Sequence, residues 1–137
     1  MAFSAKKEDK LWLWKATTTV AGTTRLLDVQ VGDRSARTLE PLYARVEGCF
    51  NPAFYATDDF APYRQILPRH KHTVGKDLTY TAEQHNSDTR HWMARFRRKS
   101  KVVTHCPEMA RLAVIAVEYV HKCGGFAELA EVISSIF

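Results

Sequence analysis

The chain has 137 residues, of which 45% are hydrophobic and 26% are charged, and its formal net charge is +5. This length fits one domain with one buried core. No run of about 18 apolar residues occurs, which excludes a membrane-spanning helix. The start, MAFSAKKEDK, has no apolar stretch after its charges, which argues against a secretory signal. The three cysteines show no C-x-x-C spacing, which is typical of reduced thiols in a cytosolic protein.

Positive charge is concentrated in one stretch of the chain. Residues 90–101 read RHWMARFRRKSK and include no acidic residue. Such a patch favours the phosphate backbone of nucleic acids, through an attraction that depends on salt and hardly on base sequence. A solvated helix face is the alternative interpretation of this basic run.

The first part of the chain predicts a hairpin and a helix. Residues 10–20, KLWLWKATTTV, are typical of a strand, and AGTT forms a turn. A second strand follows, in which three apolar residues alternate with polar ones: Leu27, Val29 and Val31. Ser35 can cap a helix that Gly48 ends.

The middle of the chain predicts short elements. Residues 54–56 form a strand with the polar sequence T-D-D at its carboxyl end. Pro62 suits the first turn of a short helix, and Pro68 ends it. Residues 69–76, RHKHTVGK, form a basic connector with a short strand at its centre. A hairpin, a helix crossover and another strand make an α/β pattern.

Helices dominate the expected second half. The first begins at its cap Thr81, ends in the basic run, and has an apolar side with Trp92, Met93 and Phe96. The next begins at Pro107, and its predicted apolar stripe is Met109, Leu112, Ile115, Ala116, Tyr119 and Val120. Gly124 ends it, and residues 124–137 form an amphipathic tail. Core packing, rather than stacking on bases, is expected for Trp12, Trp14 and Trp92.

Two acids are candidates for metal-assisted phosphoryl transfer. Asp58 follows a strand, and Glu83 stands near the start of the expected long helix, whose dipole favours phosphate. Carboxylates from different elements can hold two Mg²⁺ ions about 4 Å apart, which activate water and stabilise the leaving oxygen. Helix capping is the alternative role of such acids, and spacing alone leaves both roles open.

Four motifs follow one another along the chain: T-D-D-F-x-x-Y, H-K-H-x-x-G-K, T-A-E-Q-H-N-x-x-x-R and A-R-F-x-R-K-S. LWLWKA and VGDRSARTLEPL precede them. In this order and spacing, the set resembles the catalytic domain of bacterial transposases of the insertion-sequence-one family. The resemblance extends over residues 3–120.

The resemblance implies an RNase H-like fold, a mixed sheet with flanking helices, and a DDE triad that binds two Mg²⁺ or Mn²⁺ ions. Such enzymes hydrolyse a phosphodiester at a transposon end and then use the freed 3′-hydroxyl to attack target DNA. By position, Asp58 is the second Asp of the triad and Glu83 is its Glu, both as catalytic and metal-binding residues. Asp59 is then a neighbour rather than a ligand. The expected location is the bacterial cytosol or nucleoid.

DNA is the partner that the resemblance implies, together with a homo-oligomer and no membrane. Asn86 and Arg90 lie three and seven residues after Glu83, on the same helix face, where they could hold the carboxylate or a phosphate. The expected DNA-binding residues are Lys71, Lys76, Asn86, Arg90, Arg95, Arg97, Arg98 and Lys99.

One member of the triad has no match. The family's first Asp precedes the position of Phe3, and neither Asp9 nor Asp28 is a convincing replacement. We therefore expect an amino-terminally truncated catalytic domain, residues 1–123, whose first central strand is largely missing, followed by the tail. An inactive remnant that acts as a basic DNA-binding or interaction protein is the alternative.

Overall fold

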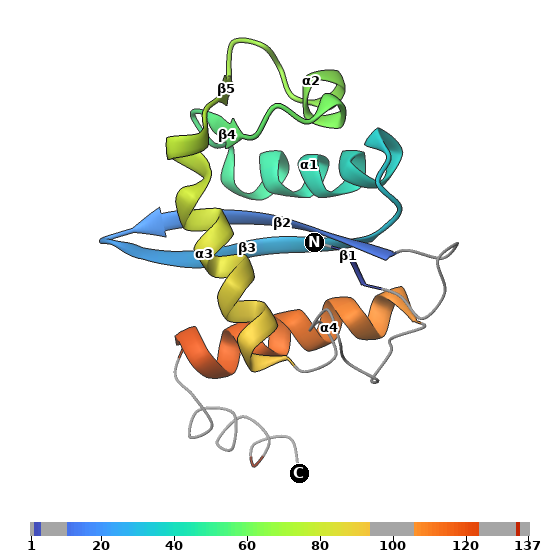
Figure 1. The fold of residues 1–137 in the computed structure, drawn as a ribbon, viewed down its shortest axis with the longest axis vertical. Coiled ribbons are helices and arrows are strands. Elements are labelled where there is room, and N and C mark those ends of the chain that lie inside the picture. Colours follow the sequence, from blue (N-terminus) through green and yellow to red (C-terminus); the bar gives the residue numbers. More distant parts are fainter. Residues whose placement is uncertain (1, 4–10, 94–105, 124–133, 135–137) are drawn as a thin grey trace.

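The computed structural model describes residues 2–3, 11–93, 106–123 and 134, and Figure 1 shows their arrangement. Antiparallel strands β1 (Ala2–Phe3), β2 (Leu11–Val20) and β3 (Thr23–Gly32) form one sheet in that order. Ala21 and Gly22 join β2 to β3 with φ angles of 50° and 78°. Tight hairpin turns that match the twist of their strands require such positive angles. The predicted hairpin is confirmed.

Helices and a second small sheet make up the rest of the described chain. Their order is α1 (Ala36–Phe50), β4 (Tyr55–Thr57), α2 (Ala61–Ile66), β5 (His72–Val74), α3 (Lys76–Trp92), α4 (Pro107–Glu118) and the π-helical turn η2 (Tyr119–Cys123). β4 and β5 pair in parallel. The α/β class is confirmed, as are the strand before T-D-D, the short helix that follows it and the strand within the basic connector.

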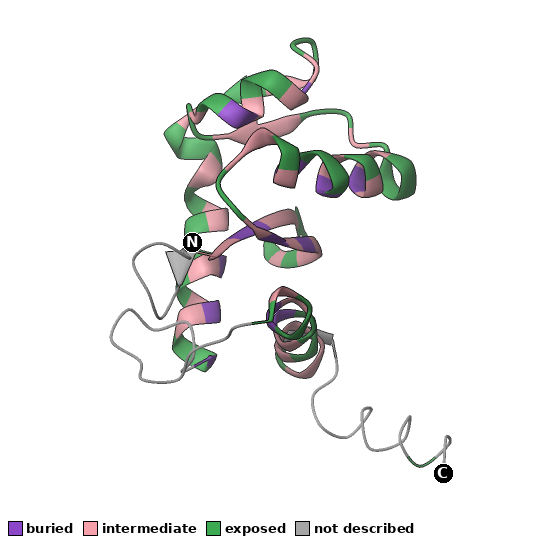
Figure 2. Ribbon diagram, turned by 90° about the vertical axis from the view of Figure 1, so that its right-hand side faces the viewer, coloured by how far each residue is buried: buried purple, intermediate pink, exposed green. Residues whose placement is uncertain are grey.

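The hairpin separates two apolar clusters. Consecutive residues of a strand point to opposite faces, so the buried Leu13 and Trp14 belong to different clusters. On the Leu13 side, the other buried members are Val29, Val31, Met93, Ala110 and Val114. On the Trp14 side, they are Leu39, Leu42 and Val46 of α1. Figure 1 accordingly shows α1, β4 and β5 on one side of the hairpin and α4 on the other, and Figure 2 shows buried positions on each of these layers.

A bulge in β3 changes the predicted alternation. The register of β2 with β3 shifts between Ala16 and Thr17, which leaves Leu27 as an extra residue in β3. Leu27 therefore packs with Trp14, whereas Val29 lies in the cluster on the opposite face. The prediction that Leu27 shares a face with Val29 is wrong for this reason.

The beginning of α1 is confirmed, but its end is not. Ser35 is the N-cap, and its hydroxyl oxygen accepts a hydrogen bond from the backbone N–H of Thr38 at 3.4 Å. The helix continues past Gly48 to Phe50, where Asn51 forms the C-cap with a φ of 42°. Asparagine tolerates this left-handed backbone better than most residues, so Gly48 is not needed to end the helix.

Both predicted ends of α3 are wrong. The helix begins at Lys76 with Gly75 as its N-cap, directly after β5, and Thr81 lies inside it. It ends at Trp92, because Met93 has an extended backbone with φ of −113° and ψ of 97°. The predicted continuation through Phe96 into the basic run therefore fails at Met93. Residues 94–105 and the tail at 124–133 and 135–137 lie outside the described part of the chain.

The buried face of α4 is not the predicted apolar stripe. The helix begins at Pro107 as expected, but Ala110 and Val114 are its buried residues. These small side chains allow the helix to approach β3 closely. Three residues of the predicted stripe are among the exposed large hydrophobic residues: Met109, Leu112 and Ile115. The core role of Trp92 is also wrong, because its side chain is exposed and stacks on His121 with ring centroids 4.3 Å apart.

Asp28 connects both helical layers to the edge of the hairpin. Its carboxylate lies 2.5 Å from Arg45 Nε of α1 and 3.1 Å from an Arg111 nitrogen of α4. Burial alone would raise its pKa, but hydrogen bonds from Arg45, from the Val29 N–H and from Arg111 together hold the pKa of Asp28 below its usual value of 3.8. The folded state is therefore stabilised by the ionised form of Asp28.

We expect Asp28→Asn to lower the free energy of unfolding by about 1–2 kcal/mol at neutral pH, since a hydrogen bond to a charged group contributes in this range and both arginines are partly exposed. A depressed pKa gives stability that is present above pH 3.8 and lost as the pH falls through the folded value. In urea unfolding, the free energies of the variant and the parent should therefore become equal at acidic pH. Asp59→Asn is the control and should have little effect, because it alters an exposed ion pair. If Asp28→Asn changed the free energy of unfolding equally at every pH, the lowered pKa of Asp28 would be contradicted.

Candidate active site

Asp58 is positioned by the parallel pair β4–β5. The last residue of β4, Thr57, has its hydroxyl oxygen 2.6 Å from His72 Nε2 of β5. Its carbonyl oxygen accepts the backbone N–H of Gly75 at 3.2 Å, just before α3 begins. These contacts bring the start of α3 next to Asp58, at the carboxyl edge of both strands. Ligands commonly bind at this edge in open α/β sheets.

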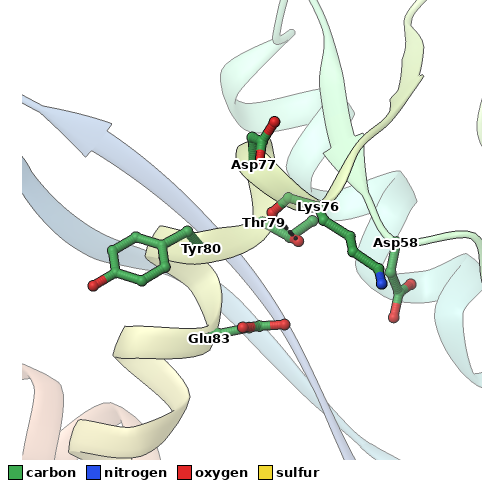
Figure 3. A pocket seen from close by; sticks show the side chains of 6 residues that line it. All are labelled: Asp58, Lys76, Asp77, Thr79, Tyr80 and Glu83. Atoms are coloured by element: carbon green, nitrogen blue, oxygen red, sulfur yellow. Dashed lines mark hydrogen bonds between the residues drawn. The ribbon is translucent and has the colours of Figure 1, made fainter.

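A pocket of about 620 Å³ lies between the end of β4 and the first two turns of α3. Its lining residues are Asp58, Lys76, Asp77, Thr79, Tyr80 and Glu83. Figure 3 shows the Asp58 carboxylate approaching from the strand side and that of Glu83 from the helix. The two acids chosen from the sequence, with 24 residues between them, therefore face one cavity.

The pocket mixes acidic and basic groups. Lys76, the first residue of α3, extends its ammonium group toward the Asp58 carboxylate in Figure 3. Among the residues that the structure describes, no group of three or more acidic, histidine or cysteine side chains is arranged to hold a metal ion. The pocket is thus lined by three carboxylates, Asp58 from the end of β4 and Asp77 and Glu83 from α3, and by one cation, Lys76.

Glu83 is not at the helix terminus where the sequence placed it. Because α3 begins at Lys76, Glu83 is the eighth residue of the helix, and Asp77 is the acid of its first turn. The predicted effect of the helix dipole at Glu83 is wrong, since that effect is confined to the terminal turn. Asp77 was missed by the sequence reasoning, although recognising Gly75 as an N-cap would have placed it in the first turn.

Asp59 and Asp28 form ion pairs outside the pocket lining. Asp59 forms an ion pair with Arg64 of α2 and does not line the pocket, in keeping with the expectation that it is a neighbour of the site. Asp28 is bound by two arginines at the edge of β3, so it is not available as a third carboxylate. Asp9 lies outside the described residues.

The expected DNA-binding residues are dispersed in the structure. Lys76 lines the pocket, while Asn86 and Arg90 follow Glu83 along α3, beyond the pocket lining. Lys71 is bound at 2.5 Å to Glu47 of α1, and hydrogen bonds from Lys71 and then Tyr55 keep the pKa of Glu47 below its usual range. The remaining residues of this set lie outside the described part of the chain: Arg95, Arg97, Arg98 and Lys99.

Comparison with known families identifies the chain. The model of a family described as IS1 transposase matches residues 1–122. The chain belongs to the IS1 transposase family. Insertion element iso-IS1n protein InsB of Shigella dysenteriae is 31% identical over 99 residues, which cover 72% of this chain and 73% of that protein. No solved structure matches the chain.

Membership of the IS1 transposase family confirms the resemblance seen in the sequence motifs. It supports a role in the transposition of an insertion element, with DNA as the partner. DDE transposases as a family use divalent metal ions. Among the described residues, no helix is long and apolar enough to cross a membrane.

Proposed function

We propose that this chain carries out phosphodiester hydrolysis and strand transfer during transposition of an insertion sequence, by a two-metal DDE mechanism. The observation that carries the proposal is the shared pocket of Asp58 and Glu83, which come from the end of β4 and from α3. In this function, both carboxylates are catalytic and metal-binding.

The donor set of the pocket fits Mg²⁺ or Mn²⁺ bound with an incomplete protein shell. Mg²⁺ prefers oxygen ligands and is usually held by one or two carboxylates, with water and substrate phosphates completing its octahedron. Asp58 and Glu83 supply such a pair. Asp77 also lines the pocket, but among the described residues no three such side chains are arranged to hold a metal ion. When bound, the metal ions polarise the phosphate and lower the pKa of the attacking water or hydroxyl.

The side chains around the pocket would bind and orient the DNA. Lys76 lies where its ammonium can approach a phosphate oxygen that is held next to Asp58. Asn86 and Arg90 extend this polar face of α3 beyond Glu83. Lys71 is not proposed to contact DNA, because its ammonium already forms an ion pair with Glu47. Arg95, Arg97, Arg98 and Lys99 are proposed from the sequence pattern alone.

The proposed architecture is RNase H-like, with residues 1–123 as the domain. Three antiparallel strands, a helix and a parallel strand pair followed by the Glu-bearing helix support this assignment. The first strand is central in such a fold, and β1 as described has only two residues.

A non-catalytic DNA-binding protein is the second candidate function. It is favoured by one observation, that among the described residues no three acidic, histidine or cysteine side chains are arranged to hold a metal ion. Both candidate functions require DNA binding, but only the catalytic function predicts DNA cleavage.

The discriminating experiment incubates the purified chain with labelled DNA that carries the ends of the insertion sequence, in Mg²⁺, in Mn²⁺ and in EDTA. The catalytic proposal predicts strand cleavage that EDTA abolishes. Binding without cleavage in either metal would contradict it and support the second candidate.

A further inference from the structure

The loop between β3 and α1 is held rigidly by its neighbours. The Asp33 carbonyl accepts the indole N–H of Trp14 at 2.9 Å. The Asp33 carboxylate accepts hydrogen bonds from the Ser35 N–H, the Ser35 hydroxyl and the Thr38 hydroxyl. A Cβ at Gly32 would lie 2.7 Å from Thr38 Cγ2, so the close approach of loop and helix requires glycine there. Arg34, in the middle of this loop, therefore leaves the backbone in a defined direction.

The Arg34 side chain is held by aromatic rings rather than by an acid. Its guanidinium carbon lies 4.3 Å from the ring centroid of Trp12 and 4.1 Å from that of Phe60. Stacking of this kind orients a guanidinium and leaves its N–H donors available. Within the described part of the chain, Arg34 forms no ion pair and its N–H groups have no acceptor.

The two acids near Arg34 already have partners. One is its sequence neighbour Asp33, and the other is Asp59, the neighbour of Phe60. Asp33 accepts the three hydrogen bonds of its own loop, and Asp59, which precedes Phe60, is paired with Arg64. Among the described residues, Arg34 is therefore an exposed, oriented cation without a counterion.

Arg34 contacts the segment that follows Asp58 of the proposed catalytic pocket. Phe60, which contacts Arg34, is two residues after Asp58. Burial, together with the Asp58 carboxylate, raises the pKa of the Tyr63 phenol to about 12, while Arg34 acts on the same phenol in the opposite direction. Asp58 and Arg34 thus influence the pKa of the same phenol, that of Tyr63. The Tyr63 ring packs edge-on against Phe60, with ring centroids 6.2 Å apart.

We propose that Arg34 binds a phosphate of the DNA backbone beside Asp58, and that Trp12 and Phe60 hold its guanidinium in place for this contact. The inference rests on DNA being the substrate of the proposed function. A guanidinium presents several N–H donors in one plane, which match two oxygens of a phosphate. Arg34 would bind the strand on the β4 side of the pocket, across from Lys76 at the start of α3.

The test measures DNA affinity without cleavage. Fluorescence anisotropy with a labelled duplex, in EDTA and over a series of sodium chloride concentrations, gives the slope of log K against log salt. Each phosphate contact contributes about 0.9 to this slope. Arg34→Gln should reduce the slope by about 0.9, because it removes the charge, whereas Arg34→Lys should retain the parent slope.

Arg37→Ala is the matched control, since Arg37 is also exposed, lies three residues further on and contacts no aromatic ring of the described residues. Its slope should equal that of the parent, and thermal melting should confirm that every variant is folded. An unchanged slope in Arg34→Gln, an equal loss in Arg34→Lys, or an equal loss in Arg37→Ala would each overturn the assignment of Arg34. Absence of DNA binding by the parent would overturn it together with both candidate functions. Arg34-dependent binding without metal-dependent cleavage would contradict only the catalytic proposal.

Discussion

Asp58→Ala should reduce metal-dependent DNA cleavage by about 1000-fold, because a catalytic metal ion contributes several kcal/mol and each 1.4 kcal/mol is a factor of ten in rate. Asp58 is at the end of β4 and faces the pocket rather than a neighbouring apolar cluster. The variant should therefore fold normally and retain most of its DNA affinity. Gel separation of cleaved strands gives the rate, and anisotropy gives the affinity.

Asp59→Ala is the control for this result. It removes a carboxylate from the adjacent position, but one that is paired with Arg64 and lies outside the pocket lining. Its cleavage rate should stay close to that of the parent. Equal activity of the parent and Asp58→Ala, or equal losses in the two variants, would contradict the role of Asp58.

Glu118→Ala should lower the free energy of unfolding by about 3 kcal/mol, since it leaves buried polar groups without their partner. Glu118 of α4 has one carboxylate oxygen 2.9 Å from His85 Nε2 of α3, and its other oxygen accepts the Leu26 N–H of β3 at 2.8 Å. The His85 side chain is only 2% exposed. Lys15 of β2 joins this network through Thr89 and the His85 carbonyl. Urea unfolding at neutral pH measures the loss.

Glu108→Ala tests whether the loss is specific to this network. Glu108 lies on the same helix, is exposed, and accepts a hydrogen bond from the Cys106 thiol at 3.1 Å. Its removal should change the free energy of unfolding far less than the removal of the Glu118 carboxylate. Glu118→Gln should lose less than Glu118→Ala, because its amide oxygen can still accept one hydrogen bond. A Glu118→Ala loss no larger than that of Glu108→Ala would contradict the importance of the buried network.

Local chemistry made the first part of the fold predictable from the sequence. The Ala21–Gly22 turn, the Ser35 cap and Pro62 each act through their own backbone or the next few residues, and the structure confirms the elements that they predict. The face that α4 buries was not predictable in this way, since both of its faces are apolar. The close approach of β3 selects the side with Ala110 and Val114.

The start of α3 was misplaced for a similar reason. Thr81 is a good cap residue by itself, but β5 ends at Val74, and the chain turns into the helix at Gly75. Because the predicted helix began too late, Asp77 and Tyr80 were not recognised as pocket residues. For the same reason, Glu83 was predicted near the helix start, although it is the eighth residue of α3. Asp58 and Glu83 nevertheless line one pocket, and their predicted metal-binding role does not depend on the helix boundary, because the motif resemblance depends on their order and spacing.

The central claim, that Asp58 and Glu83 form one metal site, is tested most directly by Mn²⁺ binding. Calorimetric titration would compare the parent with Asp58→Asn, Glu83→Gln and the double variant, with Asp59→Asn as the control. If both carboxylates hold the same ion, each single change should weaken binding at least about tenfold. The double variant should then lose less than the sum of the two single losses in binding free energy. Parent-like Mn²⁺ affinity in either single variant, or no Mn²⁺ binding by the parent, would contradict the claim.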